Sequence, residues 1–212
     1  KAVYPVNALG ITKALMEKVI QSTSRKLSNG KTILALVRYG NVLFSRGSVI
    51  PLFMKLIREK KPLTVTEPRM TRFLLPLKEA INLVGFALEN GKQGDTFVRN
   101  ASSCSMGDLA KALKNIFQSN SGIKVIGMRH GEKMHETLVS KEELLRSEDL
   151  GGYLRLSMDD RDLSYNKYLS EGEKQFGKVE DCTSKNTPQL SIEEIEEMLS
   201  KQPEIIFCVP KT

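Results

Sequence analysis

The sequence predicts an α/β fold with parallel strands, and three observations support this prediction. Short apolar runs of strand length alternate with helical patterns through most of the chain, which is the order that produces sheets covered by helices. The run at 32–37 contains no charged residue, which is typical of a parallel strand buried on both faces. With 212 residues, 40% of them hydrophobic, the chain is long enough to enclose a sizeable core.

The first helix is predicted by apolar residues at helical spacing over 14–24, and Pro5 suits a helix start because the first turn leaves its own N–H groups unpaired. Leu9 and Lys13 then lie one turn apart on one face. A lysine on a helix is usually a solvated side chain, so spacing alone gives Lys13 no role. The later elements are predicted as a helix at 49–60, a strand at 63–66, a helix at 77–89, a strand at 96–98, a helix at 106–117 and a strand at 124–128.

The sequence changes character near residue 150 and becomes polar and irregular. Within this tail, Ser191 and Glu194 have the spacing of a capping box ahead of an apolar pattern, which predicts a helix at 192–201. We therefore expect a main part at 1–150 and a C-terminal extension at 151–212 that contains one helix.

The net charge of +7 does not by itself predict a nucleic-acid partner, because Lys and Arg alternate with Asp and Glu and few aromatic residues are available to stack bases. A polyanionic small ligand explains the charge equally well. No apolar run has the length of a membrane span and no leader pattern is present, so we expect no membrane partner and a cytoplasmic location. The three cysteines are widely spaced and odd in number, which is typical of reduced thiols.

Polar residues that follow predicted strands are candidates for ligand binding, because open α/β sheets bind ligands where strands end and helices begin. The segment 45–51 has this position, although a glycine-rich connector has the same composition. Arg129 ends an apolar strand and Arg72 precedes an apolar helix, and each guanidinium has the planar shape that pairs with phosphate oxygens. A surface ion pair is the alternative interpretation of either arginine.

His130 and His135 are the two histidines of the chain, and their spacing does not predict a metal site. A helical zinc pair needs ligands at i and i+4, and no third ligand follows here. The chain also has no P-loop, no Ser-His-Asp elbow and no Gly-x-Gly-x-x-Gly loop. That loop lets the backbone approach a dinucleotide at a helix N-terminus, so this chain alone is not expected to bind such a cofactor in the usual way.

Several separated motifs occur in one order. They are Lys-Ala-x-x-Pro-x-Asn at 1–7, Arg-Tyr-Gly-Asn-Val at 38–42, Ser-Arg-Gly-Ser-Val-Ile-Pro at 45–51, Met-Thr-Arg-Phe at 70–73 and Arg-His-Gly-Glu-Lys-Met-His-Glu at 129–136. With them the chain resembles the C-terminal two-thirds of the UDP-N-acetylglucosamine 4,6-dehydratases, in the polysaccharide-biosynthesis branch of the extended short-chain dehydrogenase/reductases. The motifs at 161–165 and 181–187 resemble those of the C5-inverting members.

This resemblance implies a partial NAD(P)-binding Rossmann fold whose N-terminal half is missing, interleaved over 1–150 with a lobe that binds a nucleotide sugar. It implies NADP as cofactor and UDP-N-acetylglucosamine as substrate. The substrate gives a hydride from C4 to the cofactor, loses the C5 proton and the C6 hydroxyl as water, and takes the hydride back at C6. It is also epimerised at C5, on the route to N-acetyl-L-fucosamine of capsule or O-antigen. It also implies a homo-oligomer when the protein is full length. The alternative is a truncated, non-catalytic fragment that binds a UDP-sugar or docks on a partner.

The resemblance also implies roles for individual residues. Lys1 matches the active-site lysine that acts as base at C5, and Lys13 matches the catalytic helix lysine that holds the nicotinamide ribose. Val42 matches a residue near the nicotinamide. Leu9 stands where most of the superfamily has the catalytic tyrosine, and an apolar residue there fits the C5-inverting branch. The residues implied to line the UDP-sugar pocket, with the arginines on the diphosphate and the glutamate on ribose hydroxyls, are Asn41, Ile50, Thr66, Arg72, Arg129 and Glu132.

Overall fold

The computed structural model describes residues 1–27, 32–158 and 179–208, and the chain divides into two compact units. Both units combine helices with a pair of parallel strands, so the predicted α/β class is confirmed. The motif at 161–165 lies outside the described residues. The first unit comprises Lys1–Arg38, Ile81–Asn100 and Thr137–Cys182, and the second comprises Tyr39–Ala80, Ala101–Glu136 and Thr183–Thr212.

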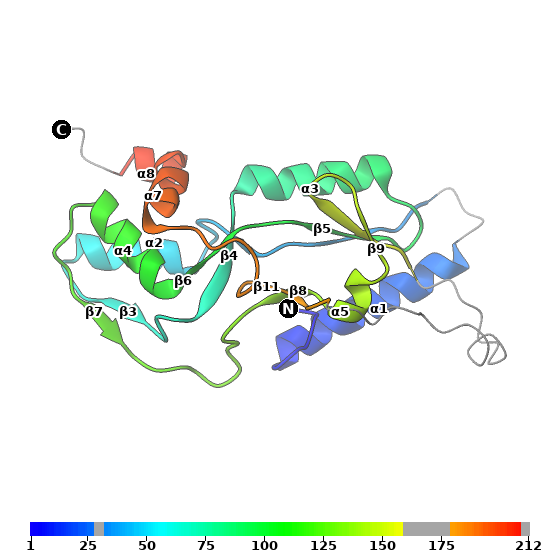
Figure 1. The fold of residues 1–212 in the computed structure, drawn as a ribbon, viewed down its shortest axis with the longest axis horizontal. Coiled ribbons are helices and arrows are strands. Elements are labelled where there is room, and N and C mark those ends of the chain that lie inside the picture. The colour runs from blue at the N-terminus through cyan, green and yellow to red at the C-terminus, as the bar shows by residue number, and fades with distance from the viewer. Residues whose placement is uncertain (28–31, 159–178, 209–212) are drawn as a thin grey trace. The chain divides into compact units, whose positions relative to one another are not determined.

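The first unit is built on a four-stranded sheet. Its elements are α1 (Ala8–Lys26), β1 (Leu36–Arg38), most of α3 (Leu77–Asn90), β5 (Thr96–Arg99), β8 (Thr137–Val139), α5 (Lys141–Leu144), β9 (Ser147–Asp149) and β10 (Tyr153–Leu156). The strand order is β1-β5-β10-β9, with β1 parallel to β5 and the other two pairs antiparallel. Helix α3 runs along β5 (Figure 1), where Leu83 and Ala87 pack against Phe97.

Strand β1 is shorter than predicted and begins four residues later. The amide of Leu34 donates to Oε1 of Gln93 at 2.7 Å, and its carbonyl accepts from the amide of Gly94 at 2.8 Å. These bonds tie the first part of the apolar run to a loop. Of the apolar run, only Leu36 and Val37 therefore pair with β5, together with the following Arg38.

Helix α1 begins at Ala8, three residues after the start expected at Pro5, because the side chain of Asn7 caps it by accepting from the amide of Gly10 at 2.9 Å. Its amphipathic pattern is reversed. The buried positions are Gly10, Glu17 and Ser24, which are spaced seven residues apart on one face. The opposite face exposes its larger apolar side chains to solvent, and these are Leu9, Ile11, Leu15, Met16 and Val19.

The second unit has two small sheets covered by helices. Its elements are β2 (Asn41–Val42), α2 (Val49–Arg58), β3 (Leu63–Val65), β4 (Thr71–Leu75), β6 (Ser103–Ser105), α4 (Met106–Ile116), β7 (Ile123–Val125), α7 (Ile192–Ser200) and α8 (Pro203–Ile206). One sheet has the order β2-β4-β6, and the other pairs β3 with β7 in parallel. The apolar core collects buried side chains from α2, α4 and α7, among them Phe53, Leu113 and Leu199.

Two sequence expectations differ from this arrangement. Strand β4 was not predicted, because its residues 71–75 were assigned to the approach to a helix; it pairs with β2 on one side and β6 on the other. In the described part of the tail, a second helix, α8, follows the correctly predicted α7. The tail is also divided between the two units, because the chain passes from the first unit to the second at Cys182. β11 (Cys182–Thr183) lies at this passage.

Candidate functional site

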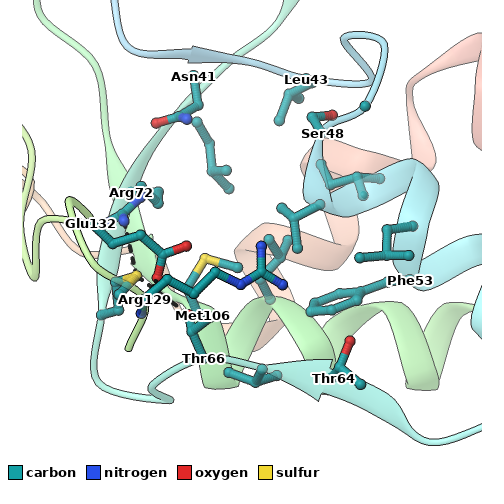
Figure 2. A pocket seen from close by; sticks show the side chains of 18 of the residues that line it. Asn41, Leu43, Ser48, Phe53, Thr64, Thr66, Arg72, Met106, Arg129 and Glu132 are labelled. Carbon is teal, nitrogen blue, oxygen red and sulfur yellow. Dashed lines mark hydrogen bonds between the residues drawn. The ribbon is translucent and has the colours of Figure 1, made fainter. Parts of the chain in front are cut away.

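A cavity of about 310 Å³ lies within the second unit (Figure 2). This volume is at the lower end of the roughly 300 to 1,000 Å³ that small-molecule sites have. Its floor is apolar and includes Phe53, Met70 and Leu109. The lining also contains every residue that the resemblance implied for the pocket, together with Val42, and these are Asn41, Val42, Ile50, Thr66, Arg72, Arg129 and Glu132.

Strand β2 brings Asn41 and Val42 to the cavity because Gly40 lets it approach β4. A Cβ at Gly40 would lie 2.3 Å from Cβ of Phe73, which is far inside van der Waals contact. Phe73 is fully buried and cannot move aside. With glycine at this position, Asn41 pairs with Leu74 of β4 and its side chain stays exposed at the cavity.

The N-terminus of α2 forms another part of the wall. Ser48 occupies the N-cap position, but its hydroxyl makes no capping bond and Oγ is buried without a hydrogen-bond partner among the described residues. One reason is that Pro51, at the third helical position, has no N–H to donate. Ile50 is 2% exposed, so its side chain belongs to the core and its backbone is the part that faces the cavity. The first-turn amides and the Ser48 hydroxyl together favour an anion.

Arg129 is the cation of this cavity. Figure 2 shows its side chain reaching across the cavity toward Phe53. Its residue is exposed, and its guanidinium makes no hydrogen bond or ion pair within the part of the chain that the structure describes. Glu132 closes a tight turn with Arg129, because Oε2 of Glu132 accepts from the Arg129 amide at 3.2 Å and the Glu132 amide donates to the Arg129 carbonyl at 3.2 Å. An approaching anion would therefore find the guanidinium available.

Arg72 differs from Arg129, because its donors are already used by the protein. Nη1 donates to the carbonyl of Thr71 at 2.7 Å, Nη2 donates to the carbonyl of Lys133 at 2.9 Å, and Nε lies 3.7 Å from a carboxylate oxygen of Glu136. Burial lowers the pKa of Arg72, although the nearby carboxylates of Glu136 and Glu132 oppose this shift. The expectation that Arg72 pairs with diphosphate therefore needs revision: it lines the cavity, but its fork holds the segment that carries Arg129.

Lys1 and Lys13 lie in the first unit. Asn7 sets the first turn of α1, and the extended segment before it folds back so that the Lys1 carbonyl comes within 2.9 Å of where a Cβ at Gly10 would be. Glycine at this position therefore permits the close approach. Lys13 follows Leu9 by one turn, and both side chains are exposed.

A buried ion network holds α1 by its polar face. Arg38 at the end of β1 donates to both carboxylate oxygens of Glu17 at 2.9 and 2.7 Å, and to both of Glu143 at 2.8 Å each. The side chains of Arg38 and Glu17 are only 10% and 9% exposed. Burial lowers the pKa of Arg38, but the hydrogen bonds to Glu143 and Glu17 outweigh it and raise the net value. For Glu143, burial raises the pKa and the Arg38 guanidinium more than offsets this, so the net shift is downward.

Sequence reasoning missed Ser48 and the network around Arg38. Ser48 lies inside the quoted motif at 45–51, and a serine three residues ahead of Pro51 was the available signal. Arg38 also lies in a quoted motif, but Glu17 and Glu143 are 21 and 105 residues away from it, so spacing gave no signal. His135 lies with Nδ1 2.8 Å from Oγ1 of Thr71. Among the described residues, no cluster of three or more His, Cys, Asp or Glu side chains is arranged to hold a metal.

Comparison with known proteins places these features in one family. A family model described as "Polysaccharide biosynthesis protein" matches residues 1–158, and one described as "Polysaccharide biosynthesis protein C-terminal" matches residues 159–205. Curated relatives from Rickettsia felis and Rickettsia prowazekii, both named UDP-glucose 4-epimerase, are 53% and 52% identical over 199 residues. These alignments cover 94% of this chain and 58% of each relative.

Solved structures agree with the fold. The structure described as Pen from Bacillus thuringiensis is 31% identical, with a TM-score of 0.81, and the match covers 95% of this chain and 59% of that one. A UDP-glucuronic acid 4-epimerase from Bacillus cereus, solved with UDP-glucuronic acid and NAD, is 22% identical with a TM-score of 0.54 and matches 61% of this chain and 43% of its own. Among the described helices, none is both long and apolar enough to cross a membrane. The match over 1–158 shows that this chain belongs to the polysaccharide biosynthesis protein family.

Proposed function

We propose that this chain forms the sugar-nucleotide-binding part, and one side of the catalytic centre, of an NADP-dependent UDP-N-acetylglucosamine 4,6-dehydratase that also epimerises C5. The observation that carries the proposal is the cavity in the second unit, which gathers every pocket residue implied by the sequence motifs. The chain spans 58% of the length of the curated relatives, so the proposal concerns the full-length protein. We place that protein, as a homo-oligomer, in the cytoplasm and in the synthesis of capsule or O-antigen sugars.

The cavity suits the diphosphate of a nucleotide sugar at one end. The Arg129 guanidinium and the open N-terminus of α2 with Ser48 are both attractive to an anion. Glu132 and Asn41 offer an acceptor and an amide to hydroxyl groups. We assign diphosphate binding to Arg129 and Ser48. We assign to Arg72 the structural role of holding the segment 129–136 through the carbonyls of Lys133 and Met134.

The acid–base chemistry is assigned to lysines of the first unit. Lys13 is exposed on α1, and Val42 lines the cavity of the second unit, so each has the accessibility that a cofactor contact needs. When bound, NADP would take up the hydride of C4 and return it to C6 after the C6 hydroxyl has left as water. A carbonyl at C4 acidifies the proton at C5, and Lys1 is the base that we assign to that proton. Leu9 has nothing to titrate, so the proton of the C4 hydroxyl goes to Thr12, Lys13 or solvent.

A second function is favoured by the relatives at 53% identity, which are named UDP-glucose 4-epimerase. An epimerase of that kind inverts C4 and loses no water. Leu9 argues for the dehydratase, because in the short-chain dehydrogenase/reductases this position usually holds the tyrosine that exchanges the C4 hydroxyl proton. A non-catalytic UDP-sugar-binding fragment is the third alternative.

One experiment separates these functions. UDP-N-acetylglucosamine and UDP-glucose are incubated with NADP and either this chain or a version extended to the length of its relatives, and products are identified by mass and NMR. We expect the extended protein to convert UDP-N-acetylglucosamine to a product lighter by one water. A C4 epimer of equal mass would establish the epimerase instead, and ligand binding without any product would leave the fragment hypothesis.

The assignment of individual residues has its own tests. Lys1→Met in the extended protein should abolish exchange of the C5 proton with solvent, and unchanged exchange would refute the assigned base. Arg129→Ala should weaken UDP-sugar binding by roughly 1.5 to 3 kcal/mol, the range for a hydrogen bond to a charged group, with little change for NADP. Loss of NADP binding would show that the arginine had been assigned to the wrong ligand.

A further inference from the structure

We infer that Ser184, in the C-terminal segment, is a positioning residue that holds the segment 129–136 so that Arg129 faces the cavity of the second unit. The inference rests on the proposed function only for the identity of the ligand. The geometry itself concerns three neighbouring chain segments of one unit: β4, the segment 129–136 and the residues just after β11.

Ser184 forms hydrogen bonds with both the amide and the carbonyl of Glu136. The Ser184 amide donates to the Glu136 carbonyl at 2.8 Å, and the Glu136 amide donates to Oγ of Ser184 at 2.8 Å. The same hydroxyl donates to the carbonyl of Thr71 at 3.2 Å and lies 2.7 Å from Oγ1 of Thr71. One buried hydroxyl thus joins the end of the segment 129–136 to strand β4.

Ser184 is held rigidly because its amide, hydroxyl and carbonyl all form hydrogen bonds. Its carbonyl accepts from Oγ of Ser103 at 2.6 Å and from Nε2 of Gln189 at 2.9 Å. Ser184 and Ser103 are both fully buried, so water cannot replace these bonds without opening the unit. A buried serine whose amide, carbonyl and hydroxyl are all paired fixes the position of its partners.

Two other residues, Thr71 and Arg72, also hold the segment 129–136. Thr71 Oγ1 lies 2.8 Å from Nδ1 of His135, and the Thr71 amide donates to the Met134 carbonyl at 3.0 Å. Arg72 donates to the carbonyls of Lys133 and Met134. These bonds hold the segment at 133–136, and three residues before Arg129 the Ile126 amide donates to the Val65 carbonyl at 2.9 Å. Ser184 determines where the held end lies, and the turn between Arg129 and Glu132 transmits that position to the guanidinium.

This gives a role to the part of the chain that follows the main family match. Ser184 lies within residues 159–205, which match the separate C-terminal family model. The described part of this C-terminal match, residues 179–205, contributes no residue to the cavity lining. It acts on the cavity through the residues that it holds.

The first test measures backbone amide exchange in the whole protein. Ser184→Ala should speed exchange of the Glu136 amide by at least about tenfold while amides in the middle of α4 stay protected. The matched control is Ser191→Ala, which removes the N-cap of α7 in the same C-terminal region and should leave the Glu136 amide unchanged. Equal protection of Glu136 in Ser184→Ala and the unaltered protein, or equal acceleration of all amides, would overturn the inference.

The second test measures UDP binding by calorimetry in a double-mutant cycle. Ser184→Ala should weaken UDP binding about tenfold in the unaltered background and less than about twofold when Arg129→Ala is already present, because the serine acts through the arginine. The same loss in both backgrounds would contradict positioning. If the unaltered protein binds no UDP, the proposed function fails, and amide exchange alone decides the role of Ser184.

Discussion

The two units of this chain are stabilised in different ways. The second unit encloses an apolar core to which α2, α4 and α7 contribute, and its buried polar side chains include the uncharged cluster of Ser184, Ser103 and Thr71. In the first unit, charged side chains are buried: Arg38 with Glu17 and Glu143, and Asp95, 3% exposed, with Arg155 at 2.7 Å. The difference teaches that the cavity depends on ordinary hydrophobic packing, whereas the orientation of α1 depends on ion pairs.

Two helices of the first unit also expose apolar side chains. In the first unit, α1 exposes Ile11, Leu15 and Val19, and α3 exposes Ile81 and Leu88, the latter at 82%. Apolar side chains aligned in this way mark a surface that other protein covers in many soluble proteins. Substitutions at comparable residues of the two units should therefore have unequal effects.

The largest effect is expected from Arg38→Met. Removing the guanidinium leaves Glu17 and Glu143 facing each other without a counter-charge, and breaking a buried pair costs about 3 to 5 kcal/mol. Urea unfolding monitored by circular dichroism measures the loss. Lys201→Met, which breaks the exposed pair with Glu197, should cost at most about 1 kcal/mol. Similar losses in both variants would remove the distinction between the units.

The next effect contrasts two leucines. Leu113→Ala in the second unit removes a fully buried side chain from the core and should cost about 2 to 5 kcal/mol. Leu88→Ala makes the same chemical change on the exposed face of α3 and should change the free energy of unfolding by no more than about 0.5 kcal/mol. Thermal and urea unfolding of both variants give the comparison, and a large loss in Leu88→Ala would mean that its face is buried.

Two glycines give a smaller contrast. Gly40→Ala places a methyl group against the immobile Phe73 and should cost about 1 to 3 kcal/mol, with weaker ligand binding in the cavity. Gly10→Ala places a methyl group 2.9 Å from the carbonyl of Lys1 and 3.0 Å from Cβ of Pro5, which must give way, while the helix gains up to about 1 kcal/mol from alanine and offsets part of this cost. We expect its unfolding free energy to change little, while C5 proton exchange slows because Lys1 moves. Unchanged exchange would show that Lys1 keeps its position.

The smallest effect is a pH dependence. Because the folded-state pKa of Glu143 lies below its usual 4.5, this carboxylate adds stability above that value, and the contribution is lost as pH falls through the lowered pKa. Glu143→Gln should therefore destabilise the protein more at pH 7 than at pH 3. Urea midpoints at both pH values measure the difference. An equal loss at both would show that Glu143 is not charged in the network.

Local signals in the sequence predicted much of the fold and little of what holds the site. The capping box of Ser191 and Glu194 gave the start of α7, because cap and partner are three residues apart. The cavity residues were predicted from motifs that are separated in the sequence and that lie together around the cavity. The task of Arg72 was not predictable, because it depends on carbonyls at 133 and 134, about sixty residues away. The role of Ser184 depends on its contact with Thr71, 113 residues away, and no rule based on sequence spacing predicts a contact at that separation.

The reversed face of α1 has a consequence for anyone who redesigns this protein. Successive residues of a helix are rotated by about 100°, so the stripe containing Ile11, Leu15 and Val19 lies nearly half a turn from Glu17. Hydrophobic burial alone would favour α1 rotated about its axis, with the apolar stripe buried and Glu17 exposed. The ion pair of Arg38 with Glu17 prevents this rotation. Lys13 lies one turn before Glu17 on the same side of α1, so this ion pair also sets the direction in which Lys13 points.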